Sequence, residues 1–72
     1  MGVIKSNLRS NLTTDEFSMI SYYIDRADEA YDSGNGSMLR AILEDAKNVL
    51  KANRAFEAVS KIDYLYAGLL LN

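Results

Sequence analysis

The chain has 72 residues, of which 49% are hydrophobic and 25% are charged, and its formal net charge is -2. A chain of this length forms at most one domain, and its composition is that of a folded or assembling protein rather than a disordered one. Because it contains no cysteine and no histidine, it has no disulfides, no thiolate zinc sites and no catalytic groups that need these residues. The near balance of charges argues against nucleic-acid or membrane partners. We therefore expect a protein that is not an enzyme, with no catalytic, cofactor-binding or metal-binding residues.

Residues 1–12 carry no strong structural signal, and we expect them to form a flexible N-terminal segment. They lack the long apolar core of a signal peptide. The most apolar run, at 62–71, has about half the length that a membrane-spanning helix needs. These features predict a cytoplasmic protein.

A first helix is predicted over residues 13–33. Thr13 and Glu16 have the spacing of a capping box, in which each side chain accepts a hydrogen bond from a backbone N–H at the helix start. Apolar residues then recur at three- and four-residue steps, the pattern of one buried helix face. They are Phe17, Ile20, Tyr23, Ile24, Ala27, Ala30 and Tyr31.

Four acidic residues fall outside that apolar stripe, and we interpret them as a solvated helix face. They are Asp25, Asp28, Glu29 and Asp32. Their spacing does not match the ligand positions of a calcium loop, and no histidine is present to assist.

A turn is predicted at residues 34–36. Gly34 suits the left-handed backbone that ends a helix, and Asn35 or Ser37 can cap the next one. Two helices joined by a turn also occur in DNA-binding proteins. The second helix carries Glu44 and Asp45, however, and suits a phosphate-lined groove poorly.

One long second helix is predicted over residues 37–70, because no proline interrupts it and Gly68 is its only glycine. Its apolar stripe drifts in phase near Asn53, where the helix either bends or breaks; the sequence there offers no strong stop, which favours a bend. A continuous helix would span about 50 Å, roughly twice what the first helix covers. The predicted fold class is therefore all-α, an antiparallel helical hairpin with a longer C-terminal helix.

The C-terminal half of that long helix has no intramolecular partner in this prediction, so we expect it to bind another protein. Tyrosines and large aliphatic side chains are typical of such interfaces. The predicted partner-binding residues are Phe56, Val59, Ile62, Tyr64, Leu65, Tyr66 and Leu69.

The C-terminal quarter of the chain, residues 54–72, together with the length and the glycine-rich hinge, resembles the small co-chaperones of type III secretion needle proteins, the YscE/EscE family. The residues that carry the resemblance are Ala55, Phe56, Glu57, Ile62, Tyr64, Tyr66, Ala67 and Gly68. It implies a cytoplasmic, non-enzymatic hairpin that binds a tetratricopeptide-like (TPR-like) chaperone, the pair keeping a needle subunit soluble before export. The alternative is a prophage- or plasmid-type regulator that self-associates as a helical homodimer and acts by protein–protein contact.

Overall fold

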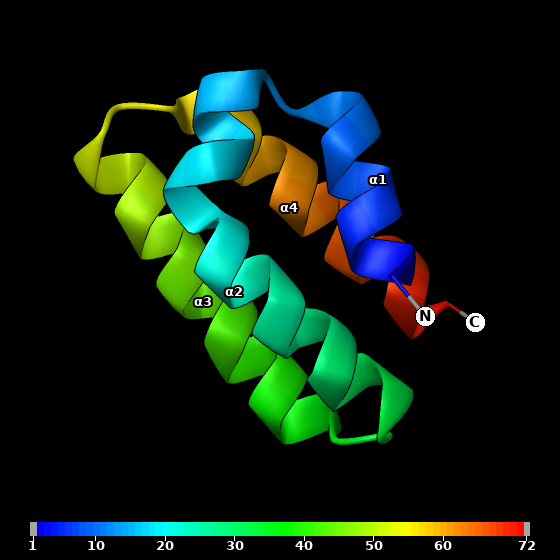
Figure 1. Ribbon diagram of the computed structural model, residues 1–72. Helices are drawn as coiled ribbons and strands as arrows, with labels where there is room; N and C mark the ends of the chain where they lie inside the picture. Colours follow the sequence, from blue (N-terminus) through cyan, green and yellow to red (C-terminus); the bar gives the residue numbers. More distant parts are fainter. Residues whose placement is uncertain (1, 72) are drawn as a thin grey trace.

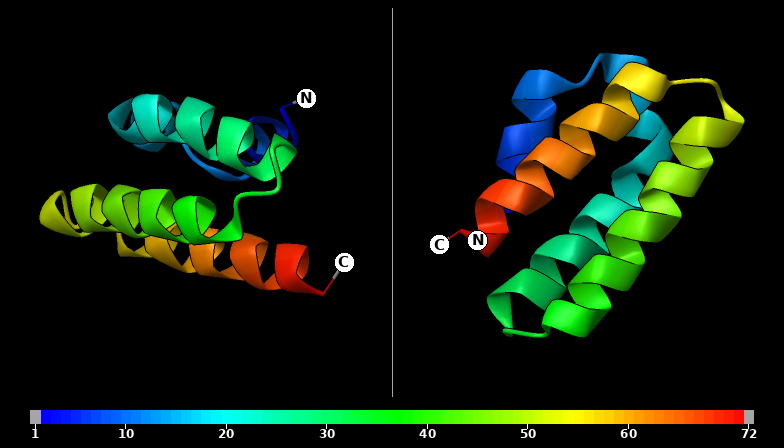
Figure 2. Two further views of the ribbon diagram at one scale, coloured as in Figure 1. Left: turned by 90° about the horizontal axis from the view of Figure 1, so that it is seen from below. Right: turned by 180° about the vertical axis from the view of Figure 1, so that it is seen from behind.

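The computed structural model describes residues 2–71 as four helices with short connections (Figure 1). The helices are α1 (Val3–Asn11), α2 (Thr14–Asp32), α3 (Gly36–Ala52) and α4 (Phe56–Leu70). Successive helices run in opposite directions, so the chain forms an up-down-up-down bundle (Figure 1). Seen from below, α1 and α2 form one layer and α3 and α4 the other (Figure 2, left). The all-α fold class is confirmed.

The hairpin of α2 and α3 has well-formed ends. The backbone N–H of Glu16 donates to the Thr13 hydroxyl (3.1 Å), and the Glu16 carboxylate accepts from the Thr13 N–H (2.9 Å), which completes the capping box. Gly34 ends α2 with φ +72°. The Asn35 side chain then accepts a hydrogen bond from the N–H of Met38 and caps α3.

The long second helix is not continuous, which corrects the predicted span of 37–70. α3 ends at Ala52, and α4 begins at Phe56. Between them the N–H of Ala55 donates to the Leu50 carbonyl (2.8 Å) and the N–H of Arg54 to the Lys51 carbonyl (3.0 Å). These two bonds form a Schellman motif, the arrangement that also ends α2. Arg54 takes the left-handed position, with φ 58°.

Residues 3–11 form α1, which corrects the expectation of a flexible N-terminal segment. α1 lies against α2 and α4 and so closes the ring of four helices. Its apolar residues Ile4 and Leu8 are fully buried, and Leu12, just after the helix, is 8% exposed. Their spacing of four places all three on one side of a helix turn, and this spacing was the signal in the sequence for a helix.

Both ends of α1 are held by charged side chains from other helices. Gly2, at its start, has no side chain to cap it; instead the Asp28 carboxylate accepts from the N–H groups of Ile4 (2.8 Å) and Lys5 (3.1 Å). At the other end the Lys61 ammonium donates to the Asn11 carbonyl (2.6 Å). A negative group at the N-terminus and a positive group at the C-terminus both match the helix dipole.

Asp28 therefore does not belong to a solvated face, contrary to the sequence interpretation. It is 9% exposed, whereas Asp25, Glu29 and Asp32 are exposed. Nearby, Asp25 forms a surface ion pair with Lys5 at 3.1 Å. The acidic run thus supplies one buried hydrogen-bond acceptor for α1 and several surface charges.

The core lies where the four helices meet. Its members are Ile4, Leu8, Leu12, Ile20, Ile24, Ala27, Ala30, Leu39, Ile42, Leu43, Ala46, Leu50, Ala58, Ile62 and Leu65. Within residues 2–71, every buried side-chain nitrogen or oxygen has a hydrogen-bond partner. Over the same residues, no helix combines the length and the apolar character needed to cross a bilayer.

Replacing Asp28 by alanine should lower the free energy of unfolding by about 1–3 kcal/mol, because the buried N–H of Ile4 loses its acceptor. The matched control is Asp25→Ala, which removes only a surface ion pair worth about 0–1 kcal/mol. Urea unfolding followed by circular dichroism compares the two. Equal losses in both variants would contradict the role of Asp28 as the cap of α1.

Replacing Arg54 by glycine should stabilise the protein by about 1 kcal/mol, because a left-handed backbone costs a residue with a side chain about 1–2 kcal/mol and costs glycine little. Ala41→Gly, on the exposed side of α3, should instead destabilise by about 1 kcal/mol. Melting temperatures check both. A lower melting temperature for Arg54→Gly would show that α3 and α4 do not end and begin in this way.

Candidate functional site

The polar side chains of the described residues do not gather into a chemical centre. Within residues 2–71, no group of three or more acidic side chains is placed to hold a metal ion. The most unusual surface of the molecule is apolar and lies on α4. It includes much of the set that the sequence predicted to bind a partner.

The structure divides the predicted partner-binding set into three environments. Ile62 and Leu65 lie in the core, with 1% and 7% of their surface exposed. Val59, Tyr66 and Leu69 are half-buried and pack against the core. Phe56 and Tyr64 are exposed, at 61% and 85%.

Ile62 and Leu65 are thus not available to a partner in the folded chain. The sequence interpretation left them uncovered because it extended α3 and α4 into one helix. The turn at residues 53–55 instead folds α4 back along α3, so these two side chains meet the core. Intramolecular packing covers the inner face of α4.

The outer face of α4 carries a second row of apolar and small residues. Figure 2 (right) shows α4 at the surface, with no other helix of the described chain in front of it. On a helix of 3.6 residues per turn these side chains fall within an arc of about 120°. We name them the outer stripe: Phe56, Ser60, Tyr64, Ala67, Leu70 and Leu71. Leu70 and Leu71 are 68% and 88% exposed.

The sequence contained a signal for this stripe that was overlooked. Phe56, Ser60, Tyr64, Ala67 and Leu71 follow one another at steps of four, four, three and four, the repeat of a single helix face. Among the stripe's large residues, Leu70 and Leu71 were missing from the predicted partner-binding set. α4 is therefore apolar on two opposite faces, of which the fold buries one.

One charged residue shares the arc of the outer stripe. Asp63 accepts a hydrogen bond from the Lys47 ammonium at 2.7 Å, and Glu44 lies 3.0 Å from the same nitrogen. The hydrogen bond to Asp63, followed by that to Glu44, raises the pKa of Lys47 above its usual value. This cluster ties α4 to α3, and the Lys47 ammonium, shared between two carboxylates, offsets part of the charge of Asp63 beside the stripe.

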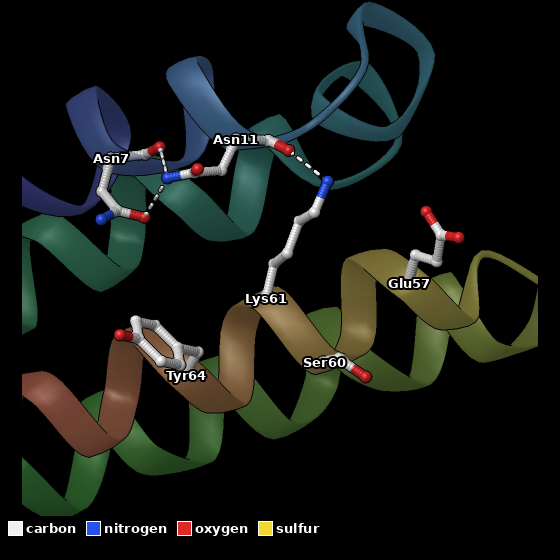
Figure 3. Close-up of a pocket in the computed structure, with 6 residues that line it drawn as sticks. All are labelled: Asn7, Asn11, Glu57, Ser60, Lys61 and Tyr64. Carbon is white, nitrogen blue, oxygen red and sulfur yellow. Dashed lines mark hydrogen bonds between the residues drawn. The ribbon is translucent and has the colours of Figure 1, made fainter.

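An open groove of about 460 Å³ runs between α1 and α4, along one edge of the outer stripe (Figure 3). Asn7 and Asn11 border it from α1; the Asn11 amide donates to the carbonyl (2.8 Å) and side-chain oxygen (3.2 Å) of Asn7. Lys61 and Tyr64 border it from α4 (Figure 3). Space of this size beside an exposed aromatic ring suits a large side chain of another molecule.

A smaller hollow of about 230 Å³ lies at the end of the bundle where the α2–α3 turn meets the end of α4. Its lining comes from α2, α3, their connection and α4, and includes Tyr31, Leu39, Tyr66, Leu69 and Leu70. This opening accounts for the half-burial of Tyr66 and Leu69. Apolar surface thus continues from the outer stripe, through Leu70, to the end of the bundle.

No protein-family model matches this chain, and no curated protein or solved structure shows significant similarity to it. The likeness to the needle co-chaperones therefore stays a prediction.

Truncating the two faces of α4 should have different effects. Ile62→Ala removes a fully buried side chain and should lower the free energy of unfolding by about 2–5 kcal/mol. Phe56→Ala acts on an exposed side chain and should change it by less than about 0.5 kcal/mol. Urea unfolding at low protein concentration measures both. A larger loss for Phe56→Ala would mean that α4 turns its other face to the core.

Proposed function

We propose that this chain is a small, non-enzymatic interaction protein whose docking surface is the outer stripe of α4. The main support is the exposure of Phe56, Tyr64 and Leu71, three large side chains that the fold leaves in water on one side of α4. Aromatic residues in such positions act as anchors when they enter a partner's apolar pocket. The groove beside Tyr64 adds a receiving site for a side chain of the partner.

The proposed partner follows from the resemblance to the needle co-chaperones. It is a TPR-like chaperone, whose apolar groove accepts one face of an amphipathic helix. The pair would keep a type III secretion needle subunit soluble in the cytoplasm before export. In this scheme α4 keeps its inner face in its own core and offers only its outer face to the chaperone.

A rigid bundle suits this role better than the open hairpin expected from the sequence. Ile62 and Leu65 fix α4 on the core, and the Lys47–Asp63 contact ties it to α3. A partner would therefore meet a helix that is already ordered. Binding to a pre-ordered helix avoids the entropy cost of ordering it.

The test is co-purification of the chain with a co-expressed TPR-like chaperone and needle subunit from the same genome. Tyr64→Glu places a charge in the centre of the outer stripe and should weaken capture at least about tenfold, since a buried unpaired charge opposes binding. Tyr22→Glu is the matched control, because Tyr22 is 65% exposed on α2, away from the stripe.

Circular dichroism should be the same for both variants and the unmodified chain, since neither side chain is buried. If the Tyr64→Glu and Tyr22→Glu variants are captured equally well, α4 is not the docking surface. If no TPR-like chaperone captures the unmodified chain, the proposal that its partner is such a chaperone is wrong.

A further inference from the structure

The outer stripe leaves a large, continuous apolar area in water. Phe56 is 61% exposed, Tyr64 85%, Leu70 68% and Leu71 88%. Taking about 150–250 Å² for a fully exposed large side chain, these four residues expose on the order of 500 Å² per chain. This lies within the range of about 300–600 Å² for the largest apolar patch on a typical monomer, and such patches are often functional.

Resting on the proposed function that this face is a docking surface, we propose that a second copy of this chain occupies it when no other partner does. Two copies that face each other would bury at most about 1,000 Å² from these four residues, and a specific interface needs about that area or more in total, with the neighbouring residues adding the rest. Ser60 and Ala67 lie among them and add to the contact. The same patch serves both copies in a two-fold symmetric dimer.

The order of side-chain sizes along α4 selects an antiparallel pair. When Ser60 of one copy lies opposite Ala67 of the other, symmetry repeats that pair, and Phe56 falls opposite Leu71 at both ends. In this register the two Tyr64 side chains lie at the centre of the contact, the small residues Ser60 and Ala67 pack on either side of them, and Phe56 and Leu71 close the ends. The antiparallel direction also opposes the two helix dipoles favourably.

The charges near the stripe are compatible with this contact. Asp63 shares the arc of the stripe, but its carboxylate is already paired with Lys47 at 2.7 Å. In this register the two Asp63 carboxylates lie near the two-fold axis, and each is held by the Lys47 of its own copy, which offsets part of their charge. The groove between α1 and α4 lies beside Tyr64 (Figure 3), and we assign it to the ring of the second copy's Tyr64.

Self-association and chaperone binding exclude each other, because both cover the outer stripe. A chaperone that binds only the free chain draws the equilibrium from dimer to complex by mass action. The dimer keeps the stripe out of water until that partner is present.

Sedimentation velocity of the full chain, from about 1 µM to 1 mM, tests self-association. The unmodified chain should form dimers as concentration rises, Tyr64→Glu should raise the dissociation constant at least about tenfold, and Tyr22→Glu should leave it unchanged. A chain that stays monomeric over the whole range overturns the proposal. Equal effects of the two variants overturn it as well, because Tyr22 lies off the stripe.

Cysteine cross-linking tests the orientation, and the absence of native cysteine makes the readout clean. Ser60→Cys and Ala67→Cys both alter exposed positions, so each variant should keep the fold. In the antiparallel dimer, a mixture of the two variants gives mixed disulfide dimers, and each variant alone gives few. Efficient self-cross-linking of each variant alone, without enrichment of mixed dimers, indicates a parallel pair and overturns the assigned geometry.

These measurements separate this inference from the proposed function. If the unmodified chain dimerises through Tyr64 but chaperone capture does not respond to Tyr64→Glu, the second copy is the occupant and the docking role toward a chaperone fails. If the chaperone captures the chain through Tyr64 while the free chain stays monomeric, the proposed function stands and self-association is overturned.

Discussion

The reversal of the chain at residues 53–55 decides which side of α4 meets the core, and the rest of the structure depends on it. Arg54 adopts a left-handed backbone, and two hydrogen bonds close the end of α3 around it. From there α4 returns along α3 and places Ile62 and Leu65 against the other helices. Without this reversal the chain would be a hairpin with an uncovered C-terminal extension. With it, the chain is a bundle with one uncovered helix face.

The bundle is closed by a helix that draws its end contacts from its neighbours. Nine residues are too few for a stable helix in water, since isolated helices shorter than about 12–15 residues are marginal. Asp28 and Lys61 supply charges of the right sign to the two ends of α1, and Ile4 and Leu8 anchor it to the core. α1 in turn covers the inner side of α4. The N-terminal segment and the C-terminal helix therefore depend on one another, although they lie at opposite ends of the sequence.

The inner and outer faces of α4 have separate tasks. The inner face holds the helix in place, and the outer face is free for a partner. A charge on the inner face would disturb the fold and binding together, whereas a charge on the outer face should act on binding alone. Both proposals, chaperone binding and self-association, use this same outer face, so under them the two would be successive states of one protein.

The sequence by itself determined the helical class, the capping box of Thr13 and Glu16 and the turn at Gly34, because these depend on residues that are neighbours in the chain. The phase drift near Asn53 marked the position but did not distinguish a break from a bend, because the usual marker of a left-handed helix end is glycine and here the residue is arginine. For the helix at residues 3–11 the sequence carries only the spacing of Ile4, Leu8 and Leu12, because the acceptor that caps its start is Asp28, 24 positions from Ile4.

For α4 the sequence identified a helix that is apolar on more than one side, and so the need for more cover than the chain provides. Only the tertiary structure decided which side is buried, because that depends on how the turn after Asn53 aims the helix at its neighbours. Ile62 and Leu65 went to the core, and Phe56, Tyr64 and Leu71 stayed in water. Local pattern sets the amount of apolar surface on a helix, whereas contacts between residues far apart in the chain set where that surface points.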